Sequence, residues 1–177
     1  MRTIRRKILA ATLAGSAIVA GFASPGQAQT DATFDITGGT LAIAEPASTV
    51  DLGEVNAGSL ALNAQLGDVT VNDDRGALVA EWTATVSSTD FTTGTETTEE
   101  TVTAANITYS SGVGTAQLLE NGAFVASVGL GLGTPQTAGT WAGIGVNHVT
   151  WNPTFVFTLA TDQVAGTYAG TVTHSVA

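Results

Sequence analysis

The chain has 177 residues, no cysteine, and five basic against 15 acidic residues. The lack of cysteine excludes disulfides, thiolate zinc sites and cysteine nucleophiles. Four of the five basic residues lie in the first seven positions, so residues 29–177 hold one arginine against 15 carboxylates, a formal charge of −14. A chain this acidic is not suited to bind a nucleic-acid backbone or an anionic membrane surface.

The N-terminus has the layout of a secretory signal. Arg2, Arg5, Arg6 and Lys7 precede a short apolar run over residues 8–20, and Ala28 ends a small-residue cleavage pattern. The run is shorter than the roughly 20 residues of a membrane-spanning helix. We expect cleavage after Ala28, export from the cytoplasm, no membrane insertion afterwards, and one domain over residues 29–177. The basic residues fit both the general secretory and the twin-arginine routes.

Apolar and polar residues alternate along residues 29–177, which is the signature of half-buried β-strands. The apolar members of the expected strands are Phe34 and Ile36, Leu41 and Ile43, Leu60 and Leu62, Val69 and Val71, Trp82 to Val86, Ile107 and Tyr109, Ala116 and Leu118, Phe124 to Leu130, Val149 to Leu159, and Tyr168 to Val176. Turn-rich breaks at 72–76, 110–112, 120–122 and 165–166 separate them, and the Thr-rich segment 92–103 is expected to be a long mobile loop. The pattern predicts an all-β, antiparallel, immunoglobulin-like sandwich of about nine or ten strands.

One cluster of polar residues carries two alternative interpretations. Arg75 is the only cation after position 28 and follows Asp73 and Asp74. It can clamp a ligand carboxylate through two bonds, although we favour an ion pair that pins a turn. Asp68, Asn72, Asp73 and Asp74 offer the oxygen ligands that Ca²⁺ prefers, but not at the spacing of an EF-hand loop. Calcium is the one cofactor that these residues suggest.

The aromatic residues and histidines give weaker signals. Trp82 and Trp151 are in phase with apolar strand faces, so we expect both in the core. Trp141 lies in the glycine-rich stretch 129–145 and is the best candidate for a partly exposed, ligand-contacting aromatic. His174 shares a face with apolar residues, which is typical of a packed histidine without a metal.

The sequence carries no familiar catalytic motif. It lacks a nucleophile elbow, a His-Glu-x-x-His zinc site, a phosphate loop and a dinucleotide fingerprint. We therefore expect a protein without enzymatic activity. A carboxylate pair for glycoside hydrolysis is defined by distance in space rather than in sequence, so a secreted hydrolase stays as an alternative.

Several segments resemble the WxL domain family. The first is the strand and turn over 69–76, followed by the strand that begins at Trp82. The opening segment 33–41, the segment 151–154 and the closing segment 164–177 fit as well. Trp82 takes the place of the first-motif tryptophan. The third position of this motif, where the family has its apolar residue, is occupied here by the small residue Ala84. His174 stands where the second motif has tryptophan.

This resemblance implies a secreted β-rich module of Gram-positive bacteria that associates noncovalently with the cell wall, with peptidoglycan as the ligand. We expect a cell-surface protein that binds peptidoglycan or another surface protein, with Trp82, Arg75, Trp141 and His174 as candidate binding residues. A self-associating secreted coat subunit is the alternative. Because the charge of −14 opposes contact with anionic wall polymers, wall binding should depend on salt or divalent ions.

Overall fold

The computed structural model describes residues 29–117 and 121–177. The predicted signal with its cleavage site and Leu118 lie outside the described residues. Every strand belongs to a compact unit formed by Ile36–Ala177.

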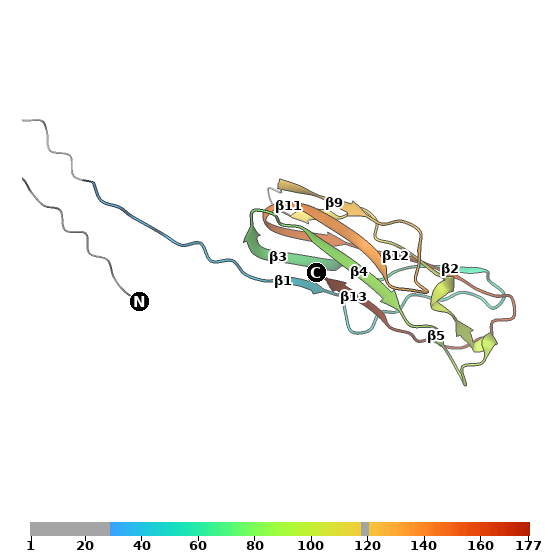
Figure 1. The fold of residues 1–177 in the computed structure, drawn as a ribbon. Coiled ribbons are helices and arrows are strands. Elements are labelled where there is room, and N and C mark those ends of the chain that lie inside the picture. The colour runs from blue at the N-terminus through green and yellow to red at the C-terminus, as the bar shows by residue number, and fades with distance from the viewer. Residues whose placement is uncertain (1–28, 118–120) are drawn as a thin grey trace, which may run out of the picture. The chain divides into compact units, whose positions relative to one another are not determined.

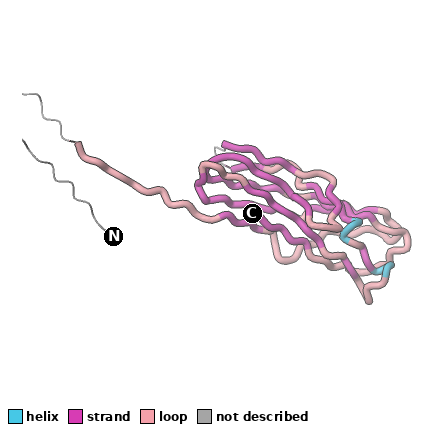
Figure 2. The backbone as a smooth tube through the Cα atoms, in the orientation of Figure 1, coloured by secondary structure: helices cyan, strands magenta, loops and turns pink. Residues whose placement is uncertain are grey.

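The described part of the chain is all-β and antiparallel, as the alternation predicted (Figure 2). Its strands are β1 (Leu41–Ala44), β2 (Ala61–Gln65), β3 (Val69–Ala77), β4 (Trp82–Ser88), β5 (Phe91–Thr92), β6 (Thr101–Val102), β7 (Ile107–Ser110), β8 (Thr115–Gln117), β9 (Asn121–Ala126), β10 (Leu130–Gly131), β11 (Gln136–Trp151), β12 (Thr154–Thr158) and β13 (Val172–Val176). Two 3-10 turns, η1 (Thr98–Glu100) and η2 (Ala104–Asn106), flank β6. The 13 strands exceed the expected number partly because β5, β6 and β10 have two residues each.

The longest strand, β11, organises the seven-stranded sheet. Its first half pairs with β4 on one side and β9 on the other, and its second half pairs with β3 and β8. The edge strands β1 and β13 then pair with β3 and β4. Strands β3 and β4 therefore follow each other along β11 instead of lying side by side.

This sheet folds over on itself halfway along β11. Trp82 pairs with Trp141, yet its ring centroid lies 6.5 Å from that of Trp151. A straight strand would separate residues 141 and 151 by about 33 Å. The bend lies at Gly145, where φ is +77° and the register with β3 shifts. Figure 1 shows β3 passing into β4 at the end of the fold where β11 bends, so that the sheet curls into two facing layers.

The four-stranded sheet, in the order β10-β7-β12-β2, continues one of these layers. Strand β12 follows β11 after Asn152 and Pro153. It pairs with β2 on one side and β7 on the other, just as the second half of β11 pairs with β3 and β8. Proline interrupts the ladder because it has no N–H to donate. The N–H of Leu66 bonds to the carbonyl of Pro153 across this interruption, at 3.2 Å.

The core lies between the layers and is largely aromatic. Phe124 stacks on Trp151 at 5.3 Å between ring centroids, and Tyr109 meets Phe155 edge-on at 5.4 Å. Much of the rest of the core consists of small and β-branched residues: Val69, Val71, Ala84, Val86, Ile107, Ala138 and Val149. Along β3 and β4 these buried residues alternate with less buried ones. The prediction that Trp82 and Trp151 belong to the core is confirmed.

Three local predictions were wrong. Residues 72–76 are not a turn, because β3 runs through them to Ala77. Segment 92–103 is not an open loop: β5 and β6 pair with each other, and the Glu100 carboxylate accepts bonds from Thr95 and from the Thr97 N–H. Phe34 and Ile36 alternate like a strand, yet residues 29–40 hold no strand, because alternation produces a ladder only where a partner strand is available.

Candidate functional site

A polar groove of about 460 Å³ lies on the surface where segments 96–106 and 160–163 meet. Its lining residues are Glu96, Thr98, Thr101, Thr103, Asn106, Ala160, Asp162 and Gln163. Hydroxyl and amide groups both donate and accept hydrogen bonds, while the two carboxylates accept. The groove therefore presents a mixed set of donors and acceptors together with a comparable amount of apolar carbon surface.

Internal bonds hold the two sides of this groove together. The Gln163 amide nitrogen donates to the carbonyls of Glu99 and Thr101, each at 3.0 Å. The Tyr168 hydroxyl reaches the carbonyls of Glu99 and Val164, at 3.1 and 2.8 Å. The groove is thus built before any ligand arrives, which reduces the ordering cost of binding.

The segment that forms one wall of the groove is held by a carboxylate. Glu100 Oε2 accepts from the Thr95 N–H and hydroxyl, each at 2.9 Å, and from the Thr97 N–H at 3.1 Å. These bonds hold the pKa of Glu100 below its usual value. Glu96, in the same segment, adopts a φ of +64°, which is uncommon for a residue other than glycine. Glu96 lines the groove from this conformation.

Three side chains of the groove, those of Thr103, Asn106 and Asp162, make no hydrogen bond to other described residues. Their donors and acceptors are available to a ligand. Val102 and Ala104, the two neighbours of Thr103 in the chain, are buried, so the segment that presents Thr103 is anchored in the core.

Arg75 belongs to an internal ion pair. Its Nε and Nη2 donate to the two carboxylate oxygens of Asp73 at 2.8 and 2.9 Å, and Nη2 also donates to the Glu81 carbonyl at 2.9 Å. The Asp73 side chain has no exposed surface, and the bonds from Arg75 hold its pKa below the usual value despite burial. The guanidinium therefore joins β3 to the start of β4.

The ion pair extends into the core through an amide. Asn147 Nδ2 donates to Asp73 Oδ2 at 3.2 Å, and its Oδ1 accepts from Trp82 Nε1 at 2.8 Å. Asn147 itself is 2% exposed. Trp82, which the family resemblance singled out, is thereby the inner end of a buried network.

The four proposed calcium ligands do not converge. Successive side chains of a strand point to opposite faces, so Asp73 points inward while Asn72 and Asp74 point outward. Asp74 accepts a bond from His148 at 2.9 Å, and Asp68 is exposed before β3 begins. Within residues 29–117 and 121–177, no group of three or more histidine, aspartate or glutamate side chains is placed to hold a metal ion.

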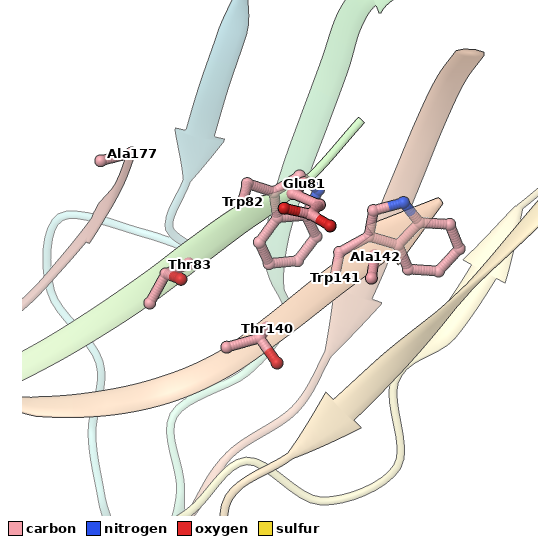
Figure 3. Close-up of a pocket in the computed structure, with 7 residues that line it drawn as sticks. All are labelled: Glu81, Trp82, Thr83, Thr140, Trp141, Ala142 and Ala177. Atoms are coloured by element: carbon pink, nitrogen blue, oxygen red, sulfur yellow. The ribbon is translucent and has the colours of Figure 1, made fainter. Parts of the chain in front are cut away.

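The expectation of a partly exposed Trp141 was wrong, since its side chain is only 3% exposed. A depression of about 360 Å³ lies on the outer face of β4 and β11, lined by Glu81, Thr83, Thr140, Ala142 and Ala177 together with the two tryptophans. Figure 3 shows the Trp141 indole pointing away from Trp82. It packs over Gly122, where an added Cβ would come within 2.4 Å of the ring. The depression therefore presents no tryptophan platform.

His174 ends a second buried network. Trp151 Nε1 donates to the Tyr109 hydroxyl at 2.9 Å, and this hydroxyl lies 3.2 Å from His174 Nε2. Because the Glu45 carboxylate can only accept, the proton of the neutral histidine lies on Nδ1, 3.3 Å from Glu45 Oε1, and Nε2 accepts from the Tyr109 hydroxyl. Burial raises the pKa of Tyr109 to about 12 and lowers that of His174, against the opposing effect of Glu45. The residue at the second-motif position is thus a packing residue in contact with Trp151.

Sequence reasoning missed Asn147, Tyr109 as a hydrogen-bonding residue, and the groove. A polar residue in phase with Val149 and Trp151 was the available signal for Asn147. The groove had no such signal, because residues 96–106 and 160–163 meet only after folding.

Among the described residues, no helix is long and apolar enough to span a bilayer. Compared with known proteins, the chain matches no family model, no curated protein and no solved structure.

Proposed function

We propose that this protein is a secreted, non-catalytic surface protein that binds the glycan of the cell wall noncovalently through the polar groove. The observation that carries the proposal is the set of hydroxyl, amide and carboxylate groups on a pre-built groove, of which Thr103, Asn106 and Asp162 make no internal side-chain bond among the described residues. A polymer rich in hydroxyl and amide groups complements such a set. The resemblance to WxL domains supports the same ligand.

Charge favours the uncharged part of the wall as the ligand. Arg75, the one Lys or Arg after position 28, donates hydrogen bonds to Asp73 from Nε and Nη2. Phosphate-bearing wall polymers would therefore meet an acidic protein whose Arg75 guanidinium is already paired with a carboxylate. Salt should strengthen binding to intact walls, because it screens this repulsion.

Two carboxylates in the groove bear on the hydrolase alternative. Glycosidases use a pair of carboxyl groups, one of which is kept protonated, typically by an apolar environment. Glu96 and Asp162 are both exposed and lie among hydroxyl and amide groups. This setting suits ligand binding better than proton donation.

The test is co-sedimentation of the exported chain, residues 29–177, with purified insoluble cell wall. The chain should sediment with the wall, more so at higher salt, and more with wall stripped of its anionic polymers. Asn106→Ala and Thr103→Val should each weaken binding severalfold, whereas Thr83→Val, an exposed threonine outside the groove, should not.

Two results would overturn the proposal. A chain that stays in the supernatant at every pH and salt concentration does not bind the wall. Soluble sugar fragments released by the wild type, and not by Glu96→Gln or Asp162→Asn, would make it a hydrolase.

A further inference from the structure

The segment ahead of β1 has the side-chain pattern of a strand. Phe34 and Ile36 are 85% and 87% exposed and alternate with Thr33, Asp35 and Thr37. Among the described residues, the first backbone hydrogen bond to the sheet is made by Gly39, whose N–H donates to the Asp74 carbonyl at 2.7 Å. Residues 33–37 thus carry two large apolar side chains on one face without a ladder.

Strand β9 presents the matching feature, an open sheet edge. Within the described part of the chain it pairs with β11 alone, so on its other side half of its N–H and C=O groups point away from the sheet. In the described residues, the next backbone bond on that side comes after the strand, where the Ser111 N–H donates to the Ser127 carbonyl at 2.9 Å. Figure 1 shows β9 at the margin of the fold.

The outer face of this edge is apolar and lacks charge. Val125 is 63% and Val128 is 78% exposed. No aspartate, glutamate, lysine or arginine occurs between Asn121 and Thr161. Proteins usually protect edge strands with charges or proline, and β9 has neither. Two copies that each carry a charge of −14 repel each other least where the surface is uncharged.

The edges formed by β13, β1 and β2 are less suited to pairing. The outward N–H of His174 in β13 is already bonded to the Glu45 carboxylate, at 2.9 Å. Strand β1 has four residues and is followed by Glu45 and Pro46, which end the ladder. Strand β2 carries the polar residues Asn63 and Gln65 on its exposed side.

From these observations we propose that residues 33–37 of one copy add as a strand to the open edge of β9 in a second copy. Phe34 and Ile36 then cover the apolar face around Val125. Six residues separate Gly39 from Thr33, so the donor segment can reach about 20 Å from its own sheet. This inference goes beyond wall binding and does not depend on it.

The geometry also determines the kind of assembly. The donor segment and the acceptor edge are different surfaces, so the contact is head-to-tail and leaves a free donor and a free acceptor at the ends of each chain of copies. One added strand covers less than the roughly 1,200 Å² at which stable interfaces begin. Association is therefore weak, and its extent rises with protein concentration.

Sedimentation velocity on residues 29–177 over a wide concentration range tests this inference. The wild type should form species of increasing mass, whereas Phe34→Asp and Val125→Asp should both stay monomeric. Val79→Asp is the matched control, because Val79 is 66% exposed on the β3–β4 connection and should leave association unchanged. Circular dichroism verifies that each variant keeps its β-sheet, and deletion of residues 29–37, which removes no strand, is a second way to remove the donor.

Mixing the two monomeric variants gives the decisive result. Phe34→Asp keeps an intact β9 edge and Val125→Asp keeps an intact donor segment, so an equimolar mixture should form one-to-one dimers and nothing larger. A mixture that stays monomeric, a wild type that is monomeric at every concentration, or a Val79→Asp variant that fails to associate would each overturn the proposal. Wall sedimentation is a separate measurement, so failure of either proposal leaves the other testable.

Discussion

Replacing Arg75 with methionine is expected to be among the most damaging single changes at the protein surface. The substitution keeps the length of the side chain and removes the guanidinium. The Asp73 carboxylate, which has no exposed surface, then retains only bonds from the backbone N–H of residue 75, at 3.1 Å, and from Asn147 Nδ2, at 3.2 Å. A buried carboxylate that loses its cationic partner stays desolvated without compensation.

The expected loss of unfolding free energy is about 2–4 kcal/mol. The two charge-assisted bonds to Asp73 disappear, each with a net contribution of about 1.5–3 kcal/mol, together with the exposed bond to the Glu81 carbonyl. The Arg75 side chain is 36% exposed, so solvent already screens part of the interaction and water can enter the vacated space, which lowers the sum. This loss is a large fraction of the total unfolding free energy of a typical domain, which is about 5–15 kcal/mol.

Urea unfolding followed by tryptophan fluorescence measures the loss. Asp74→Asn is the control, because the Asp74–His148 pair spans 2.9 Å between two substantially exposed side chains and should contribute less than about 1 kcal/mol. In the wild type the lowered pKa of Asp73 means that the ion pair stabilises the fold above about pH 4, and that this stability is lost as the pH falls further. The difference between wild type and Arg75→Met should therefore narrow in acid. A loss no larger than that of the control, or a difference that persists in acid, would refute the role assigned to the charge pair.

Three further changes probe the rest of the structure. Trp141 Nε1 is a buried donor without a partner among the described residues, so Trp141→Phe should leave the free energy of unfolding unchanged or raise it. Trp151→Phe removes the bond to Tyr109 and should lower the free energy of unfolding by about 1–3 kcal/mol, as thermal or urea unfolding can show. Because the folded-state pKa of His174 is lowered, the unfolded chain takes up its proton first as the pH drops below about 6.5, and the wild type should lose stability there relative to His174→Asn, as melting temperatures across pH can show. Glu100→Gln should speed amide hydrogen exchange across residues 95–100 with little change in melting temperature, because the lost bonds lie on an exposed segment; unchanged exchange would show that the carboxylate does not order it.

The sequence predicted well what depends on neighbouring residues. A strand exposes alternate residues to opposite faces, so its signature has a period of two and can be read from a short window. Strands β3, β4, β7, β12 and β13 therefore appeared where valine, tryptophan and phenylalanine alternate with polar residues. The core positions of Trp82 and Trp151 followed from the same pattern.

Local signals failed where a distant partner decides the outcome. Asn72, Asp73 and Gly76 have the composition of a turn, but pairing with β1 and β11 extends β3 through them. Phe34 and Ile36 alternate as well as any strand pair, and no strand forms at residues 29–40. Amino-acid composition gives a local preference for turn or strand, whereas strand pairing depends on which sheet edge lies close enough to the segment.

By itself, then, the sequence determined the all-β class, the alternation that builds the core and the acidic charge with its single arginine. Only the tertiary structure decided that β11 doubles back, and that single event brings Trp82 to Trp151 and aligns Asn147 between Asp73 and Trp82. It also decided that segments 96–106 and 160–163 meet as a groove, and that β9 is left at an open edge. These features arise from contacts between residues far apart in the chain, and such contacts leave no periodic trace in the sequence.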